Sequence, residues 1–289
     1  MTIRNIQNFV DAENNGQTFF STFRKTPNVA TGAGVWFDLS MSPGNPQPNN
    51  WPGIPYTAAP LTYSTTGGIP HGGNVPGSTK LLKTLGLLTI TAAAVPLPMI
   101  MCDYLLCYAD IDMSITPGFF QNMTNTQTLT RNITGAGVQI MAIEVASQSG
   151  AGNPQFQVQY TNSAGVTGRV TPPIACGTQV VPGTLINTAA ATARTAGPFL
   201  PLQSPDSGVR KIEAIKFLQQ DFGLITLVLV DPLENTIIRT VDAAVERNCF
   251  LDFSDMPIIS DDAFLGLICC PSGSLSGAPI HGYIQTVWG

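Results

Sequence analysis

The chain has 289 residues, of which 13 are Lys or Arg and 18 are Asp or Glu, so charged residues make up only 11% and the formal net charge is −5. Soluble domains average about 25% charged residues. The sparse cations form no basic run, which argues against nucleic-acid binding. Uncharged polar groups cost less to dehydrate than ions do, so this composition favours a surface that other protein subunits cover.

Residues 1–80 are predicted to form an N-terminal segment that includes an extended arm rich in Pro and Gly. Ile6 and Val10 have helical spacing, and residues 18–23 are typical of a short strand. Between about 40 and 80, frequent prolines prevent both a helix and a central strand. Aromatic residues also occur there, although they are scarce in linkers. We therefore expect an arm that lies against its own body or a neighbouring subunit, with a flexible linker as the alternative.

Four aromatic side chains of this segment are candidate assembly-interface anchors, because buried aromatics dominate the energetics of interfaces. They are Trp36, Trp51, Tyr56 and Tyr63. For each of them, an ordinary contact within the same chain is an equally good interpretation. An extended Pro-rich arm also loses less conformational entropy when it docks on a partner.

Residues 81–289 are predicted to form a β-sandwich body, either as one sandwich or as two packed β subdomains. Residues 155–160 alternate between apolar and polar side chains, which is typical of a half-buried strand. Six further strands are expected at residues 209–218, 224–230, 235–241, 249–253, 264–270 and 283–288. No long helical pattern alternates with them, so we predict an all-β fold, an antiparallel, jelly-roll-like sandwich.

The longest apolar run, at residues 83–103, contains Pro96 and Pro98, which would break a helix that spans a membrane. We therefore expect no membrane association. The first residues contain no apolar stretch, so we also expect no secretory signal. The six cysteines lack the C-x-x-C spacing of zinc and redox sites, and we expect buried free thiols.

The sequence contains no motif for catalysis, for a cofactor or for a metal ion. His71 and His281 lie far apart, and each is followed by Gly, so both are expected in turns. A glycan depolymerase would need two carboxylates across a cleft, for which Asp103 and Asp261 are candidates. Acidic residues at strand ends are, however, common in ordinary loops. We therefore expect no enzymatic activity.

Several segments resemble structural proteins of tailed-bacteriophage virions. They are VWFDLSMSPGNP at 35–46, GGIPHG at 67–72, DYLLCY at 103–108, GVRKI at 208–212 and FLGLI at 264–268. The resemblance spans most of the chain and rests on structural motifs. It implies a component of the virus head, an accessory, decoration or cement protein of the β-sandwich type, and it brings no catalytic residues.

The leading hypothesis is a capsid decoration or cement protein that stabilises the head of a bacteriophage through contacts between subunits. Its expected partners are other copies of the chain, in a trimer that would suit the local three-fold positions of an icosahedral lattice, and other virion proteins such as a major capsid protein. Its expected location is the virion, assembled in the host cytoplasm. One alternative is a tail or baseplate protein, structural or receptor-binding, whose glycan site would need exposed aromatics beside polar side chains. The other is the depolymerase.

Overall fold

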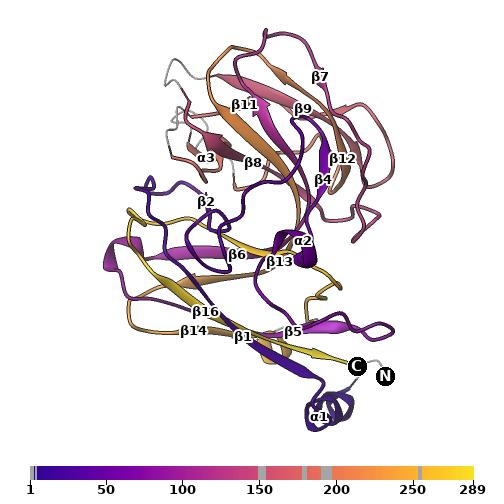
Figure 1. Cartoon of the computed structure of the whole chain (residues 1–289), viewed down its shortest axis with the longest axis vertical. Coiled ribbons are helices and arrows are strands. Elements are labelled where there is room, and N and C mark those ends of the chain that lie inside the picture. Colours follow the sequence, from indigo (N-terminus) through magenta and orange to yellow (C-terminus); the bar gives the residue numbers. More distant parts are fainter. Residues whose placement is uncertain (1–2, 4, 149–153, 178–180, 190–196, 253–255) are drawn as a thin grey trace.

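The computed structural model describes residues 3, 5–148, 154–177, 181–189, 197–252 and 256–289. Over these residues the chain is mostly β-structure in three antiparallel sheets, and the predicted all-β, sandwich-like fold is confirmed. Figure 1 shows one sheet at the lower end of the molecule, one at the upper end and one between them. We call them the lower, upper and central sheets.

The central sheet is built on two long strands that pair with each other over almost their whole length. They are β6 (Leu97–Asp112) and β13 (Leu224–Ile238). The order of the sheet is β2-β15-β6-β13-β8, and β4 pairs with β6 beside β15. The shorter strands are β2 (Phe37–Asp38), β4 (Ala58–Pro60), β8 (Gln139–Ala146) and β15 (Leu265–Cys269).

The lower sheet has the order β14-β5-β16-β1-β3, and the upper sheet has the order β10-β9-β12-β7 with β11 also paired to β9. The lower strands are β1 (Thr18–Lys25), β3 (Gly44–Asn45), β5 (Lys80–Thr89), β14 (Val245–Asn248) and β16 (Ile280–Trp288). The upper strands are β7 (Gln121–Asn122), β9 (Gln155–Asn162), β10 (Arg169–Val170), β11 (Ile174–Ala175) and β12 (Val209–Phe217). Since β1 lies inside the lower sheet, the N-terminal segment and the rest of the chain build that sheet together.

The helices are short and lie at the margins of the sheets. They are α1 (Ile6–Asn14), α2 (Tyr63–Thr66), α3 (Ile186–Ala189), α4 (Cys249–Asp252) and the 3₁₀-helix η1 (Ala92–Ala94). The N-terminal helix begins where the side chain of Asn5 accepts a hydrogen bond from the backbone N–H of Asn8, which is a typical N-cap. None of the described helices has the length and apolar character needed to cross a membrane.

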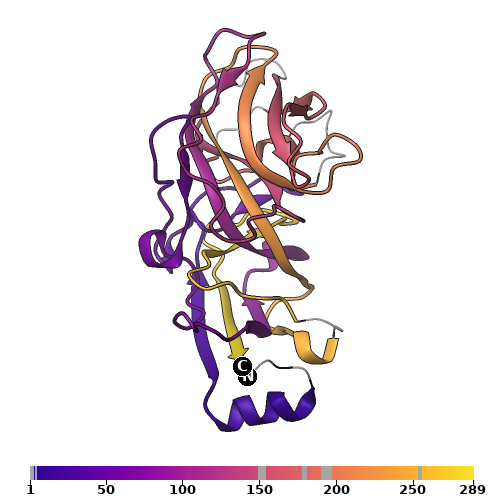
Figure 2. The ribbon, with the colours of Figure 1, turned by 90° about the vertical axis from the view of Figure 1, so that its right-hand side faces the viewer.

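One face of the central sheet forms two hydrophobic cores. Its upper part packs against the upper sheet, for example through Leu227 of β13 and Phe156 of β9. Its lower part packs against the lower sheet, for example through Met101 of β6 and Leu85 of β5. Each of these side chains is buried, which contributes roughly 1.5–3 kcal/mol per large apolar residue. Two sandwiches therefore share the central sheet, whose long strand β13 runs through both in Figure 2 (orange).

The opposite face of the central sheet is covered by residues 36–61. Tyr104 and Val230 of the sheet form a third core there with Leu61 of the covering segment, and the half-buried Trp51 packs against it. Over this stretch the Pro-rich segment lies against its own chain. The prolines prevent it from adding a full strand, and the aromatic and apolar residues between them anchor it.

Two strand predictions were wrong. Residues 224–230 and 235–241 were expected as separate strands closed by Pro232, but one strand runs from Leu224 to Ile238 with irregular pairing between Pro232 and Glu234. The pairing of β13 with β8 ends at Val230, and proline is tolerated where one side of a strand is an edge or where a bulge interrupts the ladder.

The strand expected at 249–253 is instead the short helix α4, as far as the described residues reach; residue 253 lies outside them. The side chain of Asn248 accepts a hydrogen bond from the backbone N–H of Leu251 at 3.3 Å. This local bond satisfies a backbone donor that the first turn of a helix leaves free, so it favours the helix over a strand.

Candidate functional site

Among the buried polar groups of the described residues, two clusters link the N-terminal segment to the sheets. Within the described part of the chain, no group of three or more His, Cys, Asp or Glu side chains is placed to hold a metal ion. The clusters lie where the N-terminal segment meets the central and lower sheets. We name them after their central residues, Arg131 and His71.

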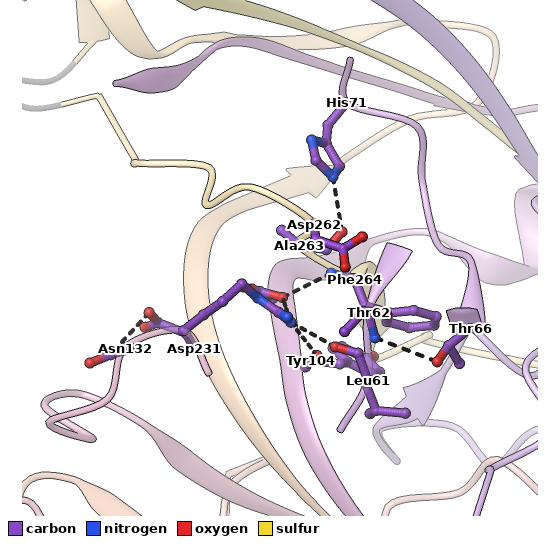
Figure 3. Close-up of polar contacts among 12 residues, drawn as sticks. Leu61, Thr62, Thr66, His71, Tyr104, Asn132, Asp231, Asp262, Ala263 and Phe264 are labelled. Atoms are coloured by element: carbon purple, nitrogen blue, oxygen red, sulfur yellow. Dashed lines mark hydrogen bonds and ion pairs between the residues drawn. The ribbon is translucent and has the colours of Figure 1, made fainter. Parts of the chain in front are cut away.

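In the Arg131 cluster, the buried guanidinium of Arg131 binds the buried carboxylate of Asp103 with two hydrogen bonds. Its Nε lies 2.9 Å from Oδ2 and its Nη2 lies 2.8 Å from Oδ1. The same Nη2 also donates to the carbonyl oxygens of Leu61, at 2.8 Å, and Tyr104, at 3.0 Å. The backbone N–H of Phe264 donates to Asp103 at 3.0 Å. Figure 3 shows how the labelled residues Leu61, Tyr104 and Phe264 converge on this point.

A second acidic residue lies beside this ion pair. Asp231 is the cross-strand partner of Asp103 in the pairing of β13 with β6, and its carboxylate accepts a hydrogen bond from Asn132 at 2.9 Å. Burial raises the pKa of Asp103 to about 6, although Arg131 and the N–H of Phe264 both act to lower it, and the charge of Asp231 raises it further. Burial likewise raises the pKa of Asp231. The cluster therefore holds more negative charge than the single guanidinium of Arg131 neutralises.

This geometry suits the fastening of the N-terminal segment better than chemistry on a substrate. Asp103 is only 4% exposed, and its two oxygens are occupied by Arg131 and Phe264. Asp261, the other candidate acid, lies in a separate ion pair with Lys80 at 3.5 Å. A glycosidase needs two acids that face each other across an accessible cleft. Here the carboxylate of Asp103 is bound by Arg131, and the carboxylate of Asp261 is paired with Lys80.

In the His71 cluster, a buried imidazole joins the N-terminal segment to the lower sheet. Its Nε2 donates to the carbonyl oxygen of Ala263 at 3.0 Å, and its Nδ1 accepts from Nζ of Lys80 at 3.2 Å. Lys80 also donates to the carbonyl of Gly73 at 2.7 Å. Because Nε2 donates and Nδ1 accepts, the imidazole is the neutral tautomer that carries its proton on Nε2. Burial and the charge of Lys80 lower the pKa of His71 to about 4.

The expectation that both histidines lie in turns was wrong. His71 lies in an irregular stretch that forms no turn at this residue, and its side chain is fully buried, whereas His281 lies within strand β16. A glycine after a histidine predicts a turn only where no neighbouring strand pairs with the backbone. At His281 the backbone pairs with both β1 and β5.

A third polar contact fixes the beginning of the covering segment. The ammonium of Lys25, on the core side of β1, donates to the carbonyl oxygens of Pro46 at 2.8 Å, Ser42 at 3.1 Å and Ser40 at 3.2 Å. Burial lowers the pKa of Lys25 to about 8, which the charge of Asp38 partly opposes. A lysine whose ammonium is surrounded by carbonyls stabilises a chain segment whose own strand, β3, pairs with β1 at only two residues.

The structure places the four candidate anchors in contacts with their own chain. Trp51 stacks on Tyr104, with ring centroids 6.3 Å apart, and Tyr63 meets the ring of His71 edge-on at 5.3 Å. The hydroxyl of Tyr56 accepts from the backbone N–H of residue 112 at 3.2 Å. Trp36 borders a surface groove of about 470 Å³ beside the lower half of β13. The four side chains lie at separate places and form no common site.

Sequence reasoning missed Lys25, Lys80 and Arg131, which carry the polar contacts described above. One signal was present for Lys25, because Ser21 and Phe23 precede it at two-residue spacing on the buried face of β1. Arg131 lies in a loop, and its partners come from positions 61, 103 and 104, so no local pattern marks it.

No family model matches the chain, and no curated protein matches it. Among solved structures, the chain has a weak likeness to a chain in the structure of the infectious bursal disease virus Gt strain. The two share 8% identity over 94% of this chain and 81% of that chain, with a TM-score of 0.17. It also weakly resembles the crystal structure of the infectious bursal disease virus VP2 subviral particle, at 9% identity over 93% of this chain and 80% of that chain, with a TM-score of 0.18. TM-scores this low carry no argument about fold or function, so a weak likeness to viral particle proteins is all that the comparisons find.

Proposed function

We propose that the chain is a structural component of a bacteriophage virion, a non-enzymatic capsid decoration or cement protein that stabilises the head through contacts between subunits. The observation that carries this proposal is an exposed apolar surface on a chain with very few free charges. Such a surface gains free energy when neighbouring subunits cover it, and it loses little through dehydration of ions.

Some of the charged side chains form ion pairs with one another within the molecule. Five ion pairs among the described residues engage ten charged side chains. The pairs of Arg131 with Asp103 and of Arg169 with Asp206 include side chains that are 7% exposed or less. The pair of Arg131 with Asp103, which is buried on both sides, therefore removes two charges from a surface that already has few.

Large apolar side chains are exposed at both ends of the molecule. At the lower end Ile6 of α1 and Leu251 of α4 are 65% and 75% exposed, and stacking of their neighbours Phe9 and Phe250 at 4.5 Å places the two helices side by side. In the upper half Phe222 is 62% exposed. Single exposed apolar residues are ordinary, but pairs of them on adjacent helices form a surface suited to a protein partner.

The partners in this proposal are other copies of the chain, as a trimer, and other virion proteins such as a major capsid protein. The location is the virion, assembled in the host cytoplasm. Trp36, beside its surface groove, is the predicted anchor whose position best fits an intersubunit contact. Trp51 and Tyr56 contribute by holding the covering segment in place, and Tyr63 packs against the ring of His71 just beyond it.

The test uses full-length protein, because the lower sheet needs β1 and a truncation would remove it. We expect the wild-type chain to sediment as an oligomer and to bind phage heads, and Leu251→Glu to weaken both by at least tenfold. Thr240→Glu, which adds the same charge at another exposed position, is the control and is expected to behave as the wild type. A chain that stays monomeric at every concentration and is absent from purified particles contradicts the proposal.

A further inference from the structure

The outer face of the lower sheet, which points away from the central sheet, contains a hollow of about 390 Å³. Ligand sites in proteins commonly enclose roughly 300–1,000 Å³. The register of the strands places two rows of side chains around this hollow. One row runs from Thr22 through Tyr283 to Gly86, and the next runs from Arg24 through His281 to Leu88.

The aromatic floor of the hollow depends on a strand position that has no side chain. A Cβ at Gly86 would lie 2.1 Å from a ring atom of Tyr283, so the ring lies flat over the glycine. The hydroxyl of Tyr283 donates across β5 to the carboxylate of Glu246 on β14, and this bond raises the pKa of the phenol to about 12. The tyrosine is therefore held as a neutral, flat platform, and the exposed ring of Phe20 extends it at 5.5 Å between centroids.

Three polar side chains around this platform have no partner among the residues that the structure describes. Within the described residues, no hydrogen bond or ion pair involves the side chains of Arg24, Asn45 or His281, all of which line the hollow. Glu246, which lies beside the platform, is engaged by Tyr283. An aromatic surface with a guanidinium, an amide and an imidazole beside it is a set of groups that recognises a ligand with an apolar face and a polar edge.

We propose that this hollow binds a saccharide that carries a carboxylate. The C–H face of the sugar lies on Tyr283 and Leu88, the carboxylate is bound by Arg24 and His281, and Asn45 hydrogen-bonds a sugar hydroxyl. A guanidinium binds carboxylates with two parallel hydrogen bonds, which selects an acidic sugar over a neutral one.

The position of the hollow favours a saccharide over an acidic peptide. Extended peptides bind mainly by adding a strand to the free edge of a sheet. Here the middle strand beneath the hollow, β16, is paired along its length with β1 on one side and β5 on the other, so its backbone groups are already used. The chain as a whole is negative, so the cationic side of the hollow reflects a local arrangement rather than general attraction of anions.

The experiment compares two probes that differ in the carboxylate, methyl glucuronide and methyl glucoside, by isothermal titration and ligand-observed NMR. We expect the glucuronide to bind at least tenfold more tightly. Arg24→Met is expected to remove this preference. Lys211→Met, which removes a cation from the upper sheet, is the matched control and is expected to preserve it.

Two further measurements separate sugar binding from anion binding. Acetate is expected to compete poorly, because it lacks the face that contacts the ring, and Tyr283→Phe is expected to retain binding because the ring remains. Equal affinity for the two glycosides, competition by acetate at the same concentration as the glucuronide, or an unchanged preference in a folded Arg24→Met variant would each overturn the proposal. None of these results depends on whether the chain assembles on a capsid.

Discussion

Replacing Arg131 with Met tests the view that the Arg131 cluster fastens the N-terminal segment to the central sheet. The variant loses both hydrogen bonds to Asp103 and those to the carbonyls of Leu61 and Tyr104. It leaves a carboxylate that is 4% exposed without its counter-charge. Breaking a buried ion pair on one side costs about 3–5 kcal/mol, so we expect a loss of that size in the free energy of unfolding at pH 7.5.

The pH dependence makes this prediction sharper. The pKa of Asp103 in the folded protein, about 6, lies above its ordinary value of 3.8, so the folded state binds the extra proton. The stability contributed by this proton is present below about pH 4 and is lost as the pH rises through 6, by about 3 kcal/mol. Without Arg131 the pKa rises further, so the loss extends above pH 6, and the variant should recover part of its stability at pH 5.

Urea denaturation at pH 5 and pH 7.5 measures both effects. Lys83→Met is the control, because it removes a cation from the partly exposed pair with Glu13 at 2.8 Å, where we expect a loss below about 1 kcal/mol. A loss below 1 kcal/mol for Arg131→Met, or the same loss at both pH values, would refute the reasoning that a buried, uncompensated carboxylate governs this site.

Two other predictions concern the lower sandwich. The pKa of His71, about 4, lies below its ordinary 6.5, so the unfolded state binds more protons between these two pH values. The free energy of unfolding of the wild type should therefore fall by roughly 3 kcal/mol as the pH falls from 6.5 to 4. Urea titrations should show a smaller fall in His71→Gln, and an equal fall would contradict the neutral imidazole. Gly282→Val should lower the melting temperature, because a Cβ there would lie 2.1 Å from the ring of Phe23 and overpacking costs about 1–3 kcal/mol. Gly73→Ala, which meets no atom within 4 Å, is its control and should change stability by less than about 0.5 kcal/mol.

The sequence was most informative where a signal is local. The alternation at residues 155–160 correctly predicted β9, whose Phe156, Val158 and Tyr160 are fully buried. A two-residue periodicity indicates that one face of a strand is buried. This signal does not depend on which strands are its neighbours in the sheet. The all-β architecture could be predicted for the same reason.

Contacts between distant positions could not be predicted. Trp51 stacks on Tyr104, which is more than fifty positions away, and Arg131 meets Leu61 across a similar separation. Nothing in the neighbourhood of either residue encodes its partner, because the partner is chosen by how the sheets pack. The length of β13 was missed for a related reason: the local signal of Pro232 predicts a break, while pairing with the whole of β6 keeps the strand continuous.

The sharing of β6 and β13 by two sandwiches determines how the molecule responds to mechanical load. Backbone hydrogen bonds between these two strands continue from one sandwich into the other, so a pull between the upper and lower ends loads many of them in shear at once rather than one after another. The two sandwiches therefore cannot unfold one after the other, and pulling on a single molecule should give one large unfolding event. Tension applied between the two ends is therefore carried across the whole length of the molecule.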